Sequence, residues 1–194
     1  MVRNLISWVN LNFGTVRGFI RLVLGEIEFL TGRLSQFTTL QPEQVQRLVF
    51  VCLGNINRSA FAHAVSSGLG IRTTSIGLST TTGASAFEKA IAIAPIYGFN
   101  LYIHRATDFK DYIYQEGDLL LAMEVRHAHE LLKRGIPRGS VVLLGHWAHP
   151  HRIHIHDPHM HTDEYYRTCF AIIYSAVVNI VSDLRTKGSP CATK

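Results

Sequence analysis

The sequence predicts an α/β protein: a small four-stranded parallel sheet with helices on both faces, preceded by an α-helical N-terminal extension. From residue 47 onward, short apolar runs alternate with segments of helical periodicity, as in strand–helix–strand units. These runs lack the polar alternation of half-exposed strands, which indicates strands buried on both faces. No strand-like run precedes residue 47. The 194 residues are 47% hydrophobic, enough for a packed core, which excludes a wholly disordered chain.

The elements of the main domain follow from these runs and periodicities. The expected strands are 47–52, 71–75, 118–123 and 141–145. The expected helices are 59–69, 86–98, 124–134 and a long last one that begins with Asp163 and Glu164 and ends at Arg185 to Gly188. We therefore expect one domain over 47–186 and a flexible tail over 187–194. Ligands of parallel sheets bind at the carboxyl ends of the strands, so the chemistry is expected there.

The expected extension, residues 1–46, carries an apolar helical stripe that requires a partner. Its members recur at spacings of three and four: Val16, Ile20, Val23, Ile27, Leu30, Leu34 and Phe37. In one alternative, residues 16–37 pack on their own domain or on a second copy of the chain. In the other, the helix lies on a membrane surface with Arg3, Arg17, Arg21 and Arg33 near lipid headgroups.

Composition limits the function and the location. The formal charge of +5 favours anionic ligands, but no basic run supports nucleic-acid binding. Neither a secretory signal nor a run of about 18 apolar residues is evident, so we expect a cytoplasmic protein, with peripheral membrane contact as an alternative. Three cysteines imply no disulfide framework. Cys169 is expected as a packed thiol and Cys191 as an exposed tail thiol.

The first apolar run ends in a segment suited to a tetrahedral anion. A cysteine leaves the strand and a helix begins near residue 58, which gives Cys52-Leu53-Gly54-Asn55-Ile56-Asn57-Arg58-Ser59. Amides of such a turn form an anion nest, and the helix N-terminus adds unpaired donors. Gly54 and Asn55 tolerate left-handed backbone, and Arg58 can donate a bidentate pair to phosphate. We therefore predict phosphate binding by residues 53–59.

Cys52 is the candidate nucleophile of this loop. A thiol in such a positive field is expected to ionise readily, and a thiolate that faces a bound phosphoryl group can attack it in line. Ser59 can donate a hydrogen bond to the sulfur. The alternative is a buried structural cysteine beside an ordinary turn and a surface arginine.

These residues resemble the active-site loop of the low-molecular-weight protein tyrosine phosphatases, and the similarity extends over about residues 47–186. Further stretches similar to that family are Ser75-Ile76-Gly77, His104-Arg105-Ala106, Leu120 to Glu124 and Asp157-Pro158. The resemblance implies a cysteinyl-phosphate on Cys52, transition-state stabilisation by Arg58, and Asp157 as general acid and then base, without metal or cofactor. It also implies that Ser75 and His104 support Asn55.

The sequence departs from the family around the expected pocket. Asn57 stands where many members have a second cysteine, so a protective disulfide with Cys52 is not expected there. His159 and Met160 follow Asp-Pro, where the family usually has tyrosines, and residues 78–83 include no aromatic side chain. A pocket without these rings would stack less well on phosphotyrosine, so we expect a weak or altered substrate preference.

Seven histidines lie between residues 146 and 161. We expect a solvated polar loop that carries the general acid. Two alternatives are transition-metal binding by histidines spaced two apart, and histidines that become charged below about pH 6.5 and stabilise the Asp157 carboxylate.

The favoured function is hydrolysis of phosphotyrosine or small aryl phosphates. Two alternatives are a catalytically weak anion-binding module of the same fold and an arsenate reductase, which would need cysteines that are absent between Cys52 and Cys169. The resemblance implies a tyrosine-phosphorylated protein as partner, which in bacteria is often a kinase of polysaccharide export.

Overall fold

The computed structural model describes residues 2–192, and side chains over residues 4–191. Its four strands are β1 (Arg47–Cys52), β2 (Thr73–Gly77), β3 (Asp118–Ala122) and β4 (Val141–Leu143). They form one sheet in the order β2-β1-β3-β4, with every pair parallel. The predicted sheet is thus confirmed. Because the chain moves from β1 to β2 on one side and then to β3 on the other, the carboxyl end of β1 lies at the switch point of the sheet, where open α/β folds bind ligands.

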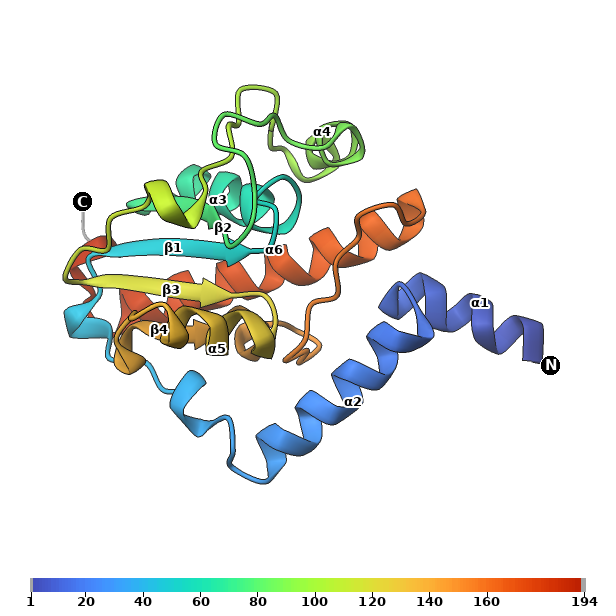
Figure 1. Ribbon diagram of the computed structural model, residues 1–194, viewed down its shortest axis with the longest axis horizontal. Helices are drawn as coiled ribbons and strands as arrows, with labels where there is room; N and C mark the ends of the chain where they lie inside the picture. The colour runs from blue at the N-terminus through green and yellow to red at the C-terminus, as the bar shows by residue number, and fades with distance from the viewer. Residues whose placement is uncertain (1, 193–194) are drawn as a thin grey trace.

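Helices cover both faces of the sheet, as predicted (Figure 1). On one face lie α3 (Arg58–Gly68) and α6 (Asp163–Thr186), whose rings Phe61 and Phe170 stack with centroids 4.0 Å apart. On the other lies α5 (Val125–Lys133), which buries Ala128 and Leu131 against β3 and β4. In the described part of the chain, only α6 is long and apolar enough to cross a membrane, and half of that stretch is buried in this core.

Three predicted elements differ in extent by two or more residues. The strand expected over 71–75 is β2, which spans Thr73–Gly77. The helix expected over 86–98 is α4 (Glu88–Ile93) followed by a 3-10 turn, Ala94–Tyr97, because Pro95 cannot continue the α-helical hydrogen bonds. Gly98 then ends the turn with a φ of +82°. The last strand is shorter than expected, since Leu144–Trp147 forms another 3-10 turn. Further 3-10 turns occur at Ser35–Phe37, Pro42–Gln44, Phe109–Asp111, Arg138–Ser140 and Pro190–Ala192.

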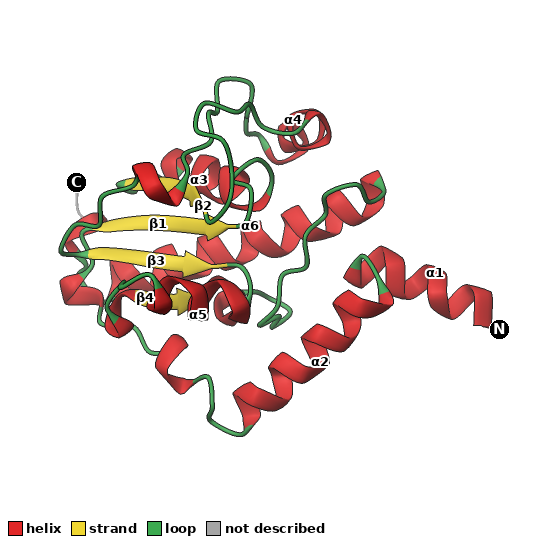
Figure 2. Cartoon of the chain, viewed as in Figure 1, coloured by secondary structure: helices red, strands yellow, loops and turns green. Residues whose placement is uncertain are grey.

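The N-terminal extension is helical, with no strand before β1 in the described residues (Figure 2). It forms α1 (Val2–Phe13) and α2 (Val16–Leu30), separated at Gly14, whose φ of +75° interrupts the helix. Thr15 caps α2, since its hydroxyl accepts the Gly18 N–H at 2.9 Å. Figure 1 shows both helices on one side of the sheet domain, and the side chain of Arg3 lies outside those described.

The docking of α2 corrects part of the prediction for the apolar stripe. Leu34 and Phe37 are buried in the main domain, as one alternative required. Within α2, however, the buried positions are Gly18 and Gly25, with Leu22 and Phe29 partly buried. The remaining stripe residues are exposed: Val16, Ile20, Val23, Ile27 and Leu30. Glycine lets the helix backbone approach closely, so α2 docks through its least bulky face and packing on its own domain is wrong for these five residues.

The C-terminal segment also differs from the expected flexible tail. Ser189 is buried and its hydroxyl donates to the Val45 carbonyl at 2.8 Å. Cys191 is buried rather than exposed, and its N–H donates to the same carbonyl at 3.2 Å. Residues up to 192 therefore close over the start of β1, and residues 193–194 lie outside those described.

Candidate active site

Cys52 is the last residue of β1, and its buried sulfur faces the turn that leads into α3. The Asn55 N–H donates to Sγ at 3.2 Å, and the Ser59 hydroxyl lies 3.0 Å from it. The Ser59 oxygen also accepts from the Asn55 amide at 2.8 Å, which leaves its proton to donate to the sulfur. Both groups are therefore placed to donate hydrogen bonds to the sulfur.

The loop shape depends on Asn55, which is fully buried with a φ of +50°. Its side-chain amide donates to Ser75 at 2.9 Å, and its side-chain oxygen accepts the Thr107 N–H at 2.9 Å. Its backbone carbonyl lies 2.7 Å from Nε2 of His104. The structure thus places both expected support residues at Asn55, and these three polar contacts stabilise a left-handed backbone that would otherwise be strained.

The loop amides are available to an anion. Among the described residues, the amides of Leu53, Gly54, Ile56 and Asn57 donate to no protein acceptor. Asn57 immediately precedes α3, so the first unpaired N–H groups of that helix extend the same cradle. The Asn57 side chain is held by the Tyr166 hydroxyl at 3.2 Å.

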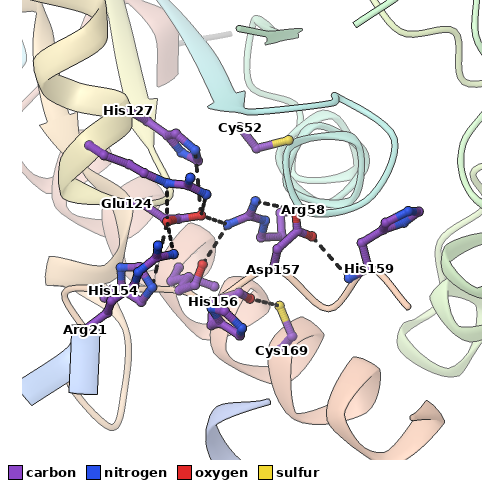
Figure 3. A network of polar contacts seen from close by, with 12 residues as sticks. Arg21, Cys52, Arg58, Glu124, His127, His154, His156, Asp157, His159 and Cys169 are labelled. Carbon is purple, nitrogen blue, oxygen red and sulfur yellow. Dashed lines mark hydrogen bonds and ion pairs between the residues drawn. The ribbon is translucent and has the colours of Figure 1, made fainter. Parts of the chain in front are cut away.

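Arg58 is fully buried at the start of α3, where its guanidinium contacts both acids of the site (Figure 3). One terminal nitrogen donates to Glu124 at 2.7 Å and to the Ile155 carbonyl at 2.8 Å, and the other donates to Asp157 at 2.8 Å. Burial lowers the pKa of Arg58, but the negative charges of Asp157 and Glu124 raise it by more than burial lowers it. The net pKa lies above the usual value, so the group stays charged. Its Nε is buried with no protein partner, which leaves one donor for an anion.

Asp157 reaches the site from the segment between β4 and α6. Its carboxylate accepts from Arg58 and, at 3.2 Å, from the N–H of His159. Burial raises the pKa of Asp157, but the positive charge of Arg58 and the hydrogen bond from the His159 N–H together lower it by more. The net pKa therefore lies below the usual value. With no substrate charge nearby, Asp157 is therefore an ionised base at neutral pH.

A cavity of about 200 Å³ joins the nucleophile to the candidate acid. Its lining residues are Cys52, Leu53, Gly54, Ile56, Asn57, Ser79, Asp157 and His159. No Phe, Tyr or Trp belongs to this described lining, in keeping with the departures noted in the sequence. His159 supplies the one ring, and Phe87 packs against its edge with centroids 4.6 Å apart.

Glu124 is the site residue to which sequence reasoning gave no role. It follows β3 directly, is almost fully buried, and receives hydrogen bonds from both Arg58 and Arg126. Arg21 of α2 approaches it to 4.0 Å. Burial raises its pKa, but Arg58 outweighs this, so the pKa lies well below the usual value. The sequence offered only an acid near the end of a predicted strand, which places Glu124 at the edge of the sheet where ligands bind but assigns it no role.

Two buried histidines complete the surroundings of Glu124 (Figure 3). Nε2 of His127 lies 3.6 Å from the Glu124 carboxylate, and Nε2 of His154 lies 3.8 Å from it. Burial lowers the pKa of His127 to about 3 and that of His154 to about 4. Both rings are therefore neutral at physiological pH.

The histidine-rich stretch differs from the expected solvated loop. His154 is buried, and His156 contacts Thr15 at 3.3 Å between Nε2 and Oγ1. Burial lowers the pKa of His156 to about 4, as it does for His154, so these two histidines do not supply the charge that the alternative requires near pH 6.5. His159, beside Asp157, is the histidine that contributes to the lowered pKa of that carboxyl group. Among the described residues, no group of three or more His, Cys, Asp or Glu side chains is arranged to hold a metal ion.

Comparison with known proteins identifies the family. Residues 47–189 match the model of the low molecular weight phosphotyrosine protein phosphatase family, and the chain belongs to that family. AmsI of Erwinia amylovora, a probable low molecular weight protein-tyrosine-phosphatase, is 30% identical over 72% of this chain and 98% of its own length. Wzb of Escherichia coli K12 is 31% identical over 66% of this chain and 85% of its own length.

Solved structures agree with the fold. The crystal structure of AmsI superposes with a TM-score of 0.64 over 75% of this chain and 97% of its own, at 28% identity. Wzb from Escherichia coli K30, crystallised with sulphate, gives a TM-score of 0.63 over 72% of this chain and 99% of its own, at 29% identity. AmsI and Wzb K30 are covered over nearly their whole length while at least a quarter of this chain is not, and the family match begins at residue 47, so most of residues 1–46 has no counterpart in these two structures.

Proposed function

We propose that this chain hydrolyses phosphotyrosine in proteins through a cysteinyl-phosphate intermediate. The observation that carries the proposal is that Cys52, residues of the loop with unpaired amides and Asp157 line one cavity, while the buried Arg58 donates to Asp157 from behind it. Each part has a role in phosphoryl transfer: a nucleophile, donors for the equatorial oxygens and a proton carrier. Membership of the phosphatase family supports the same conclusion.

In the first step, the Cys52 thiolate attacks phosphorus. An S–P bond forms while the P–O bond to the tyrosyl oxygen breaks, and Asp157 gives a proton to the leaving phenolate. The loop amides and the unpaired Nε of Arg58 bind the equatorial oxygens. The Ser59 hydroxyl stabilises the sulfur before attack and again when it leaves.

Asp157 must carry a proton for this step, although its pKa is low without substrate. A bound phosphate dianion can raise the pKa of Asp157 in two ways. Its charge disfavours the nearby carboxylate, and its oxygens compete with Asp157 for the Arg58 donors. Both effects raise the pKa of Asp157 when substrate is present. The same residue can therefore protonate the leaving group and afterwards act as a base.

In the second step, water attacks the phosphorus of the intermediate. Asp157 takes the proton from that water, the S–P bond breaks, and inorganic phosphate and the Cys52 thiolate are released. In this scheme the electrostatic work is done by Arg58, the amides and the helix N-terminus.

The substrate partner is a phosphotyrosyl protein, and a tyrosine kinase of polysaccharide export is the specific partner that we propose. The cavity lacks the tyrosine rings usual in the family, and His159 and Leu53 border it instead. We therefore propose a reduced preference for aryl over alkyl phosphates. Kinetics with aryl, alkyl and phosphotyrosyl-peptide substrates test this, and ordinary peptide efficiency would count against it.

The central test compares p-nitrophenyl phosphate hydrolysis by the wild type and Cys52→Ser. We expect turnover to fall to background in Cys52→Ser and to persist in the control Cys191→Ser, whose thiol lies at the opposite end of β1. Mass spectrometry of acid-quenched wild type should detect phosphate on Cys52. Phosphate binding without turnover in the wild type would instead support an anion-binding module.

A further inference from the structure

The outward side of the two N-terminal helices takes no part in the proposed catalytic mechanism. It carries large apolar side chains that are 36% to 80% exposed, which we call the outer face. Its residues are Leu5, Ile6, Trp8 and Leu11 on α1, with Val16, Phe19, Ile20, Val23, Leu24, Ile27 and Leu30 on α2. So many large apolar side chains exposed on two adjacent helices indicate an interaction surface.

The two helices share this face because aromatic contacts bridge their junction. The rings of Trp8 and Phe13 lie 5.4 Å apart, and those of Phe13 and Phe19 lie 4.9 Å apart. Arg152 lies over the Phe13 ring at 4.6 Å, which attaches the junction to the main domain. The exposed apolar side chains of α1 and α2 therefore adjoin at a junction that is attached to the main domain.

The opposite side of α2 is already occupied, so the outer face is not merely a poorly docked helix. Glu26 accepts the Ile153 N–H at 3.1 Å and contacts His151 at 3.0 Å. A Cβ on Gly25 would lie 2.7 Å from the Ile153 side chain, so backbone and loop are in direct contact there. These contacts orient α2 so that the side chains of the outer face point away from the main domain.

The charges of α2 decide between possible occupants. Glu26 faces the main domain, and Glu28 lies at the edge of the outer face, where it and Leu24 border a cavity shared with Arg126 and His154. Arg17 and Arg33 are exposed, and no described carboxylate lies within ion-pair distance of either. An apolar face with one acid at its edge and two unpaired arginines beside it fits an anionic lipid surface.

A second copy fits less well, because arginines flank both ends of α2. An antiparallel pair of these helices would place Arg17 near Arg33, and a parallel pair would place like residues together, with only Glu28, at the edge of the face, to compensate. The 15 residues of α2 are too short to span a bilayer of about 30 Å. We propose that α1 and α2 dock the protein on the anionic surface of a membrane, lying in its interface.

Vesicle co-sedimentation of the full chain tests the proposal. We expect binding to phosphatidylcholine vesicles that contain phosphatidylglycerol, and at least about tenfold weaker binding to phosphatidylcholine alone. The double variant Ile20→Glu, Ile27→Glu should lose at least about tenfold in partitioning. The matched control is Ile103→Glu, Ile113→Glu, since those isoleucines are 85% and 81% exposed on the catalytic domain. It should bind like the wild type.

Further arms make the outcome decisive. Arg17→Gln with Arg33→Gln should lower binding to anionic vesicles by about tenfold and abolish the preference for them. Thermal unfolding and p-nitrophenyl phosphate hydrolysis without lipid should be unchanged in all variants, which separates this proposal from the proposed function. Equal binding to both vesicle types or no binding would overturn it. So would a lipid-free dimer, seen by light scattering, that the Ile20→Glu, Ile27→Glu variant dissociates.

Discussion

Arg58 donates a 2.8 Å hydrogen bond to Asp157, so the cation of the proposed phosphate loop also holds the carboxylate that we propose as the proton carrier. Without substrate this pair keeps Asp157 ionised. Substrate binding and acid function are therefore linked through one guanidinium, and a change at either residue alters both.

Replacement of Asp157 by Asn removes the proton carrier but leaves the nucleophile. We expect kcat to fall by about 100-fold with phenyl phosphate and by less with p-nitrophenyl phosphate, because a better leaving group needs less protonation. Steady-state kinetics with both esters measure the difference. An equal loss on the two substrates would contradict the role as general acid.

Glu124→Gln leaves the buried charge of Arg58 without its main structural partner. We expect the free energy of unfolding to fall by about 3 kcal/mol and kcat/KM by about tenfold or more, since Arg58 loses its fixed position. Urea unfolding and kinetics measure these effects. The control Glu130→Gln breaks a half-exposed ion pair with Arg134 on α5 and should cost less than about 1 kcal/mol. Similar losses in both variants would contradict the positioning role.

The buried neutral histidines predict acid sensitivity. The pKa values of His127 and His154 are about 3 and about 4 in the folded protein, below about 6.5 for an unfolded chain. Between these values the unfolded state binds more protons, so stability falls as the pH drops from about 6.5 towards 4. Each histidine contributes about 1.4 kcal/mol per pH unit in that window.

Urea unfolding at pH 7.5 and pH 5 measures this dependence. His154→Gln should reduce it, whereas His129→Gln, a control on the exposed side of α5, should leave it unchanged. A wild type whose stability is equal at the two pH values would contradict the prediction.

Glu26→Gln should loosen the segment that carries Asp157. The charged acceptor for the Ile153 N–H is lost, at a cost of about 1 to 2 kcal/mol, and this amide should exchange its hydrogen faster. Hydrogen exchange followed by mass spectrometry measures the effect. The control Glu28→Gln, two residues along α2, removes a carboxylate to which no described group donates a hydrogen bond and should leave exchange at Ile153 unchanged.

The sheet and the phosphate loop were predictable because their signals are local. Fully apolar runs identify buried strands, and Cys52 to Ser59 combine strand end, turn and helix start in one short segment. The contact between Arg58 and Asp157 joins residues far apart in the chain and had no sequence signal, since the family resemblance only assigned Asp157 to the same site.

Other features had no adequate sequence signal. Periodicity located the apolar stripe and predicted that its large side chains pack against a partner. In the structure, α2 instead docks through Gly18 and Gly25. Glycine contributes almost nothing to a hydropathy pattern, so the sequence did not indicate this face. Glu124 was indistinguishable from an ordinary acid at a strand end. Position beyond the last helix predicts an exposed Cys191, yet the Ser189 hydroxyl donates to the Val45 carbonyl and the segment is buried.

The contacts between the N-terminal helices and residues 151–156 have a practical consequence for anyone who prepares this protein. Asn12, Thr15 and Glu26 each bond to that segment, which leads directly into the proton carrier. A recombinant form trimmed to the family's usual length would release these tethers and uncover Ile153. Kinetic constants measured on such a fragment would describe an enzyme with a freer acid loop, and the native protein should be purified with its first helices intact.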